Sequence, residues 1–459
     1  STILDAFRRA RLPEQLEGDL LTFVDALRCP VAVRSSSLLE DSHYQPFAGI
    51  YNTYMVPYLD NHGRMLSMLC DAIKGVYASV YFKDSKAYMQ ATRNVIDEEK
   101  MAVVLQEVVG RRYGDHFYPN ISGVGRSLNY YPLDDERAEE GTVSLALGLG
   151  KYIVDGGRTL RVCPAHPARV LQTSDTEMAL RETQTRFCAL DLKNMGENFS
   201  VDDGFNLLRL PVKVADADGA LQFIASTFNP TDQVIYPGLY PGGRKIISFV
   251  GVLEHDVVPL PQIMSEVLQM GEEAMRRPVE IEFAVEIDAK NRSCVFYLLQ
   301  IRPMVDVRTE VNIDLSAIDP ARVLLRSDNA LGHGNFDDLT DVVYVKTDDY
   351  SAGNNPLIAE EIEHLNAGFL AEGRHYVLIG PGRWGSSDPW LGVPVKWPAI
   401  SAARLIVEAG LTNYRVDPSQ GTHFFQNLTS FGVGYFTIND YIGDGLYNRA
   451  ALDVLPAVQ

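Results

Sequence analysis

The spacing of apolar residues along the chain predicts helices and strands in alternation. Apolar positions recur every three to four residues, as in helices with one buried face, over 13–28, 63–82 and 261–277. Short apolar runs, typical of buried strands, lie at 31–33, 101–109 and 143–150. Residues 279–286 and 295–302 have the pattern of a hairpin whose two strands are joined by a largely polar loop. These patterns together predict an α+β protein.

The pattern of apolar and polar residues changes in the second part of the chain. After Pro303 the pattern predicts strands at 342–345 and 375–379 and a helix after Pro398. We place the main boundary near 305–325, which gives one domain over 1–305 and an additional C-terminal α/β domain over 306–459.

Composition narrows the functional classes. The 459 residues include 41 Lys and Arg against 60 Asp and Glu, and a net charge of -19 disfavours nucleic-acid binding. A local basic pocket for one small anion remains compatible with this charge. Five scattered cysteines without a CxxC pair favour a reducing cytoplasm over a disulfide framework or a zinc knuckle. The histidines have no HExxH spacing, and neither a membrane span nor a signal peptide is expected.

The hairpin at 279–302 contains several polar residues that could bind a ligand or a metal ion. Side chains alternate faces along a strand, so Glu280 and Glu282 share one face and Gln300 and Arg302 share another. If these faces line one cleft, the two carboxylates suit Mg²⁺, and Arg302 suits a phosphate. The alternative is a half-exposed hairpin with a Glu–Arg ion pair.

Two further segments suit phosphate. The first is Arg34-Ser35-Ser36-Ser37, where a strand leads an arginine and three hydroxyls into a loop with free backbone N–H groups. The second is the glycine-rich segment with Gly148, Gly150 and Lys151, which does not match the P-loop pattern. The alternatives are a serine-rich turn with Arg34 paired to an acid, and a plain strand-to-helix turn.

Three blocks, in this order, resemble the ATP-binding domain shared by phosphoenolpyruvate synthase and pyruvate phosphate dikinase. They are 31–37 with Phe47-Ala48-Gly49, the strand 101–109, and 280–283 with Leu299-Gln300-Ile301-Arg302-Pro303. Gly148-Leu149-Gly150 resembles the Gly-Leu-Gly turn of the same family. The resemblance covers about residues 28–305.

This resemblance implies an ATP-grasp-like fold that binds ATP and Mg²⁺. It places Arg34 and Arg302 on phosphates, Glu280 and Glu282 on Mg²⁺, and Gln300 on a phosphate or the metal shell. The hinge at Gln106, Glu107 and Val108 would hold adenine. In the family, ATP phosphorylates a histidine on a swivelling domain, which passes the phosphoryl group to pyruvate.

The chain also departs from the family. We find neither the lysine-bearing Gly-Gly-Lys-Gly segment, which the family has upstream of the position of Arg34, nor the pyruvate-binding barrel. Partners such as pyruvate or phosphoenolpyruvate would therefore act through domains absent from this chain.

In the second part of the chain, Gly421-Thr422-His423 resembles the phosphohistidine motif; the alternative is a core or cap histidine. The segment 380–385 fits GxGxxG but reads as a tight loop. A non-catalytic nucleotide-sensing or scaffold protein, or a dikinase with another acceptor, remains open.

Overall fold

The chain divides into two compact units. The computed structural model describes residues 2–37, 40, 49–92, 99–133, 135–193, 202, 204–304, 318–328, 330–331, 335–347, 350–411 and 422–456. Unit 1 consists of Ser1–Leu128, Glu139–Val154 and Arg158–Met304, and unit 2 of Asn129–Ala138, Asp155–Gly157 and Val305–Gln459. The short segments 129–138 and 155–157 therefore pack with unit 2, although they interrupt unit 1 in sequence. Among the described helices, none has the length and apolar character needed to cross a membrane.

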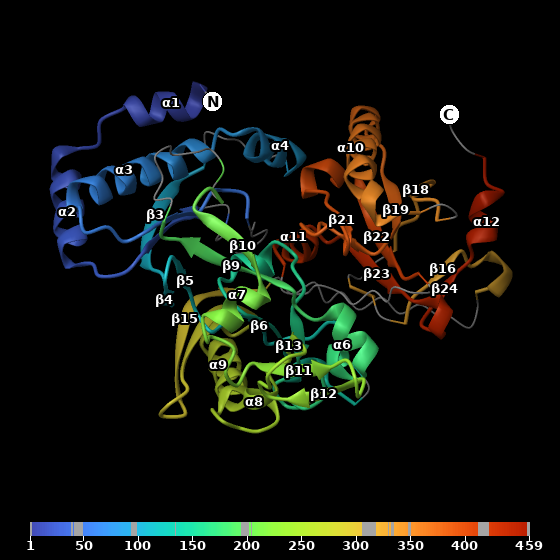
Figure 1. Ribbon diagram of the computed structural model, residues 1–459. Helices are drawn as coiled ribbons and strands as arrows, with labels where there is room; N and C mark the ends of the chain where they lie inside the picture. Colours follow the sequence, from blue (N-terminus) through green and yellow to red (C-terminus); the bar gives the residue numbers. More distant parts are fainter. Residues whose placement is uncertain are drawn as a thin grey trace. The chain divides into compact units, whose positions relative to one another are not determined.

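Unit 1 begins with a small antiparallel sheet covered by helices. Its strand order is β2-β1-β3, with bounds Tyr54–Val56, Val31–Ser37 and Met101–Glu107. The helices α1 (Thr2–Arg9), α2 (Glu14–Ala26) and α3 (His62–Ser79) precede or separate these strands, and α4 (Lys83–Thr92) follows α3 (Figure 1). The apolar stripe predicted for 63–82 is the buried face of α3, where Met65, Leu69 and Val76 have no exposed surface. The sequence thus predicted this helix and the face that packs on the sheet.

Strand β1 is longer than the sequence pattern predicted. It pairs with β3 along its whole length, from Val31 opposite Glu107 to Ser37 opposite Met101. The expected loop at 34–37 with free backbone N–H groups is therefore wrong, since these residues belong to a strand inside a three-stranded sheet. Arg34 projects from a rigid strand rather than from a loop. Phe47 and Ala48 lie outside the described residues.

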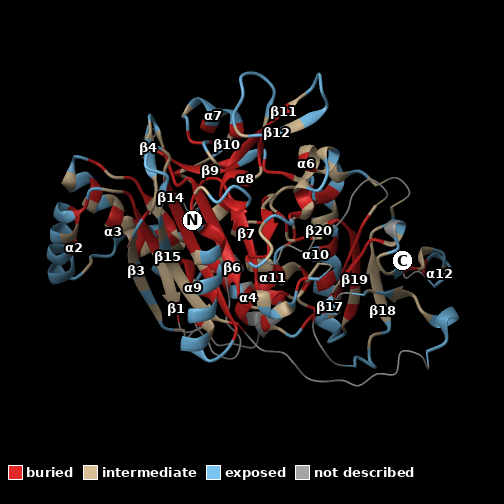
Figure 2. Ribbon diagram, turned by 90° about the horizontal axis from the view of Figure 1, so that it is seen from below, coloured by how far each residue is buried: buried red, intermediate tan, exposed pale blue. Residues whose placement is uncertain are grey.

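The central sheet of unit 1 is antiparallel and has five strands in the order β15-β14-β6-β7-β8. Their bounds are Ser293–Pro303, Val279–Asp288, Ile121–Arg126, Thr142–Ala146 and Leu160–Val162. Figure 2 shows β6 and β7 as buried strands, and every residue of both is buried. Helix α9 (Leu260–Met275) packs on this sheet through Met264 and Leu268.

A glycine opposite an aromatic ring allows β6 and β14 to pair closely. Gly123 lies opposite Phe283 in the register of the two strands. A Cβ atom on Gly123 would lie 2.1 Å from Cζ of Phe283, so the ring occupies the place of a side chain. Phe283 also stacks on Phe296 with ring centroids 4.7 Å apart. The Gly-Val-Gly sequence of β6 is thus a packing requirement of this sheet.

Two smaller sheets complete unit 1. One has the order β10-β9-β5-β4, with bounds Leu207–Pro211, Arg186–Asp191, His116–Tyr118 and Arg111–Tyr113. The other has the order β12-β11-β13, with bounds Val234–Pro237, Ala225–Asn229 and Arg244–Ile247. The short helices of unit 1 are α5 (Lys151–Val154), between β7 and β8, α6 (Thr176–Glu182), α7 (Val212–Ala217) and α8 (Val250–Leu253).

Unit 2 contains a mostly parallel sheet in the order β17-β23-β22-β19-β18. The bounds are Ala330–Leu331, Gly434–Ile438, Ala403–Ala409, Tyr376–Pro381 and Asp341–Tyr344, and only β17 is antiparallel to its neighbour. Its helices are α10 (Asn355–Glu372), α11 (His423–Ser430) and α12 (Arg449–Asp453). The two-stranded pairs are β16 (Leu325–Arg326) with β24 (Leu446–Tyr447), and β20 (Arg383–Trp384) with β21 (Gly392–Val393).

In unit 2 the sequence pattern predicted two strands correctly and the position of one helix wrongly. Strands β18 and β19 lie where 342–345 and 375–379 were predicted. The helix predicted after Pro398 is wrong, because a single 3₁₀ turn, Trp397–Ile400, is followed by the parallel strand β22. A buried apolar run has no periodicity that separates strand from helix. After 380–385 comes no dinucleotide-type helix: β19 leads into β20, and Gly380 makes room for the Trp384 ring.

Candidate functional site

Two neighbouring glutamates of β14 form the centre of a polar cluster in unit 1. The side chains of Glu280 and Glu282 leave the strand on the same face, and Arg302 of β15 contacts both. Arg302 Nε donates to Glu280 Oε1 and its terminal nitrogen donates to Glu282 Oε1, each at 3.0 Å. In the register of the two strands, Glu280 lies opposite Arg302 and Glu282 opposite Gln300.

A β-bulge in β15 places these groups on one face. Glu282 pairs with Gln300 but the next residue, Phe283, pairs with Leu298, so Leu299 is an extra residue in β15. Strict alternation would put Phe296, Gln300 and Arg302 on one face. Because the bulge shifts the alternation by one residue, Phe296 stacks on Phe283 in the apolar layer while Arg302 meets the glutamates. The bulge thus lets one face of the hairpin pack in the apolar layer while the other face carries the polar cluster.

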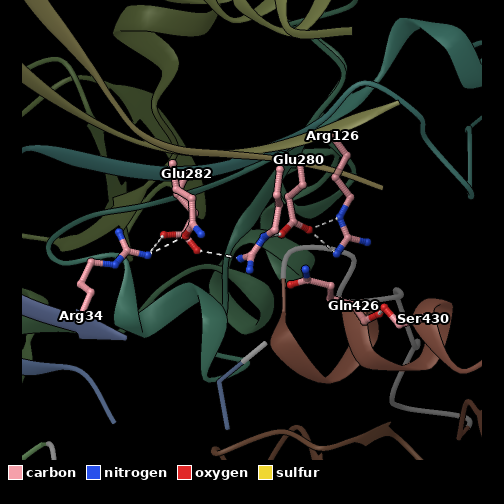
Figure 3. Close-up of polar contacts among 8 residues, drawn as sticks. Arg34, Arg126, Glu280, Glu282, Gln426 and Ser430 are labelled. Atoms are coloured by element: carbon pink, nitrogen blue, oxygen red, sulfur yellow. Dashed lines mark hydrogen bonds and ion pairs between the residues drawn. The ribbon is translucent and has the colours of Figure 1, made fainter. Parts of the chain in front are cut away.

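Arg34 connects the small sheet to the central sheet of unit 1. Its terminal nitrogens donate to Glu282 Oε2 at 3.0 Å, to Gln300 Oε1 at 2.6 Å and to Gln106 Oε1 at 3.0 Å. Figure 3 shows Arg34 beside Glu282 and Arg126 beside Glu280, at the two ends of the same cluster. The family resemblance predicted that Arg34 would lie opposite the two glutamates, Gln300 and Arg302, and the contacts of the structure bring these side chains together.

Arg126 was missed by the sequence analysis. It ends β6, lies opposite Glu280, and donates from Nε to Glu280 Oε2 at 2.7 Å. Its side chain is 2% exposed. The only signal in the sequence was an arginine at the end of an otherwise apolar, glycine-containing strand. That β6 is the neighbour of β14 follows from long-range pairing, which residue patterns do not indicate.

The charges of the cluster are close to balanced. Three guanidinium groups face Glu280 and Glu282, and the charge of Glu40 also acts on Arg302. All four oxygens of Glu280 and Glu282 accept from a guanidinium. Burial lowers the pKa of Arg302, but the charges of Glu280, Glu282 and Glu40 together outweigh burial and raise this pKa above its ordinary value. Three guanidinium groups on one face suit an anionic ligand with several oxygens.

The donor set also suits Mg²⁺, on one condition. Two carboxylates and the amide oxygen of Gln300 are hard oxygen ligands of the kind that Mg²⁺ takes in nucleotide sites. Each carboxylate oxygen has two lone pairs, one of which is directed at an arginine here. A cation fits beside Glu280 and Glu282 if the arginines turn toward another anion.

The hinge at 106–108 is connected to this cluster through Gln106. The amide of Gln106 accepts from Arg34 and donates from Nε2 to the Leu299 carbonyl at 3.0 Å. The backbone N–H of Val108 donates to the Pro30 carbonyl at 2.9 Å, so this N–H already has a partner. Burial, with a contribution from Glu107, raises the pKa of the nearby Cys29 thiol to about 11.

The glycine-rich segment is explained in part by packing. Gly148 has a φ of +87°, and a Cβ there would lie 2.6 Å from the Cys188 carbonyl oxygen of β9. The Leu149 N–H donates to the same carbonyl at 2.9 Å. Gly150 precedes the short helix α5, which Lys151 begins. Gly148 is thus required by the close approach of β9, and a nucleotide role for Gly148, Gly150 and Lys151 stays a prediction.

His423 lies in unit 2, at the first turn of α11. The Thr422 hydroxyl accepts from the Phe425 N–H at 3.1 Å, which is the contact of an N-cap. His423 is the first residue of the helix and is partly exposed. Gly421, the other part of the predicted motif, lies outside the described residues.

Comparison with known families agrees with the chemistry of the cluster. The fold and the arginine–glutamate cluster define an α+β module suited to nucleotide phosphates. Residues 1–316 match the family described as pyruvate phosphate dikinase, AMP/ATP-binding domain, and the chain belongs to this family. A nucleotide is therefore the ligand class of this part of the chain. A search of curated proteins found no match to the chain.

Proposed function

We propose that unit 1 is an ATP-grasp-like module that binds ATP with Mg²⁺ and positions its phosphates for transfer to a histidine carrier. One observation supports this most strongly. Arg34 from one sheet and Arg126 and Arg302 from another converge on Glu280 and Glu282. Phosphoryl transfer depends mainly on positioning and charge neutralisation, which such a cluster supplies.

The arginines and glutamates exchange partners when nucleotide binds. A triphosphate offers Arg34 and Arg302 stronger anionic acceptors than the carboxylates they contact in this structure. Once these arginines turn to phosphate oxygens, Glu280, Glu282 and the Gln300 amide oxygen are available to hold Mg²⁺. The bound ion would neutralise charge on the phosphates. Arg126 stays with Glu280 and fixes the orientation of its carboxylate.

The adenine would lie at the hinge formed by Gln106, Glu107 and Val108. Because Gln106 contacts Arg34 and the Leu299 carbonyl, the base site and the phosphate site are mechanically connected. Gly148, Gly150 and Lys151 would cover the phosphates. Pyruvate or phosphoenolpyruvate would be the later partner, through domains outside this chain.

The test is thermal unfolding with ATP and Mg²⁺, with ATP and EDTA, and without nucleotide. Ligand at 100 times its Kd stabilises the folded state by about 2.7 kcal/mol. Glu282→Gln should remove most of the Mg²⁺-dependent part of the increase in Tm, and Arg302→Ala should lower the affinity for ATP itself. Glu286→Gln is the matched control, because Glu286 lies on the same strand but pairs with Arg111 outside the cluster. Equal increases in Tm for all four proteins would refute the site.

A second function is supported by a specific observation. All four carboxylate oxygens are already paired with arginines, so the cluster is complete as a structural ion-pair network. This favours a protein that senses nucleotide or serves as a scaffold without transferring phosphate. Formation of AMP from ATP, dependent on Glu282, would exclude that function. A dikinase with another acceptor would form AMP without needing pyruvate.

A further inference from the structure

Three side chains of different chemistry gather in unit 1 away from the arginine–glutamate cluster. They are Glu140, Cys163 and His166, whose ligand atoms all lie within 4.8 Å of one another. His166 Nε2 is 3.1 Å from Glu140 Oε2, and Cys163 Sγ is 4.0 Å from the same oxygen. The sequence shows no metal-ligand spacing among the histidines, because Glu140 is far from Cys163 in sequence and a single Cys-x-x-His is a weak pattern.

The fold explains why these residues meet. Strands β7 and β8 are antiparallel, with Val143 opposite Val162, so the residues before β7 lie beside those after β8. Cys163 directly follows β8, and a turn closed by the His166 N–H and the Cys163 carbonyl, at 2.9 Å, returns His166 toward it. Glu140 ends the 3₁₀ turn Ala138–Glu140 just ahead of β7. The cluster therefore stands on a rigid hairpin.

We infer that Glu140, Cys163 and His166 form a binding site for a transition-metal ion of the Zn²⁺ class. Sulfur, nitrogen and carboxylate oxygen are the donors that Zn²⁺ takes, at about 2.0–2.3 Å. In a tetrahedron with such bonds, neighbouring ligand atoms are about 3.3–3.8 Å apart. The observed 3.1 and 4.0 Å bracket this spacing, and the Cys163 sulfur lies within 4.8 Å of the His166 ligand nitrogen, so shifts of at most about 1 Å complete the geometry. A thiolate disfavours Mg²⁺ and Ca²⁺ at this position.

The arrangement does not fit a nucleophilic cysteine. In a Cys–His–acid triad the histidine stands between the thiol and the carboxylate. Here the thiol and the imidazole both approach the same oxygen of Glu140, which is the convergence expected around one ion. Without metal, His166 Nε2 and Glu140 Oε2 are joined by a hydrogen bond. When the ion binds, the thiol proton leaves to solvent, and the neutral imidazole binds through the Nε2 lone pair with its proton on Nδ1.

Burial and access agree with a metal site. The buried Cys163 is 2% exposed, which protects a thiolate–metal bond from solvent. The His166 side chain is 26% exposed and leaves an entry path for the ion. Three protein ligands leave a fourth position for water. Bound metal would join the start of β7 to the turn after β8 and so stabilise the sheet that carries Arg126, which lies opposite Thr142.

The test uses the whole chain freed of metal with a chelator and titrated with Co²⁺ alone. We expect one equivalent to bind with a sulfur-to-cobalt charge-transfer band and a visible tetrahedral spectrum, and Zn²⁺ to displace it. Cys163→Ser should abolish the band, and His166→Ala should keep the band while weakening affinity at least about 100-fold. Cys188→Ser, a buried cysteine on β9, is the matched control and should behave as the parent.

The opposite results are equally definite. A parent protein that binds no Co²⁺, or a charge-transfer band that survives Cys163→Ser, would overturn the inference. Because Cys163→Ser changes a buried position, its circular dichroism is compared with the metal-free parent, and the partly exposed His166→Ala gives an independent reading. Nucleotide is absent from all these titrations, so their outcome does not depend on the proposed ATP site.

Discussion

Arg126 and Glu280 face each other across β6 and β14 in an ion pair that is almost closed to solvent. Their side chains are 2% and 5% exposed, and Nε of Arg126 lies 2.7 Å from Oε2 of Glu280. Arg302 takes the other carboxylate oxygen, so Glu280 has an arginine on both neighbouring strands. Removing one partner from such a buried pair costs more than the pair itself contributes, because the remaining charge stays buried.

Arg126→Met should therefore destabilise the protein strongly. We expect a loss in the free energy of unfolding at the lower end of about 3–5 kcal/mol, since Arg302 still neutralises Glu280. Urea unfolding measures this loss. Arg8→Met is the control, because Arg8 pairs with Asp71 in a partly exposed ion pair, and this variant should lose only about 1 kcal/mol. A similar loss in both variants would show that burial of the Arg126–Glu280 pair does not set its cost. Adding Glu280→Gln to Arg126→Met should restore part of the stability, because the buried charge is then removed.

Gly123→Ala tests the packing of Phe283 over β6. The new methyl group would lie 2.1 Å from Cζ of the ring, so the ring or the strand must move. We expect a destabilisation of about 1–3 kcal/mol, reduced when Phe283→Leu is combined with it. Gly18→Ala in helix α2 has open space around its Cβ and should instead stabilise by about 0.5–1 kcal/mol. Additive effects of Gly123→Ala and Phe283→Leu in urea unfolding would argue against this contact.

Glu286 should make stability fall as pH rises. Burial raises the pKa of this carboxyl above its ordinary 4.5, against a smaller lowering by Arg111. The folded protein then holds the proton more tightly than the unfolded chain, so the free energy of unfolding decreases from pH 4.5 up to the raised pKa. Glu286→Gln removes this dependence, and the difference in stability, variant minus parent, should increase with pH in that range. A constant difference across a series of urea curves would show that the pKa is not raised.

Label transfer tests the role of His423. If α11 carries the phosphoryl acceptor, protein incubated with ATP labelled in the β- or γ-phosphate should gain an acid-labile label on His423. The backbone N–H groups at the start of this helix would steady the phosphate. His423→Ala should abolish the label, whereas His364→Ala, at an exposed position of α10, should retain it. Label that persists in His423→Ala would assign His423 to the structure of unit 2 alone.

The sequence predicted those features that depend on local alternation. Glu280 with Glu282, and Gln300 with Arg302, share faces because neighbouring side chains of a strand point in opposite directions. The resemblance to a nucleotide-binding family predicted that Arg34 joins these four residues. Neither the resemblance nor the alternation predicted Arg126, because Arg126 lies beside Glu280 only through the pairing of two strands whose residues are 154 positions apart. The sequence pattern also did not predict the strand β22, since an apolar segment buried on both faces of a parallel sheet has no alternation of apolar and polar residues.

The extra residue in β15 has a consequence for how this strand tolerates change in length. Gln106 uses the carbonyl of Leu299 rather than its side chain, so substitutions at 299 leave Gln300 and Arg302 where they are. Deleting Leu299 would make Phe283–Leu298 and Glu282–Gln300 consecutive pairs of a regular ladder, so Gln300 and Arg302 would stay on the glutamate face. A shortening by one residue at this point would thus keep both faces of the strand and remove the backbone carbonyl that Gln106 contacts, so its cost would fall on the connection to the small sheet.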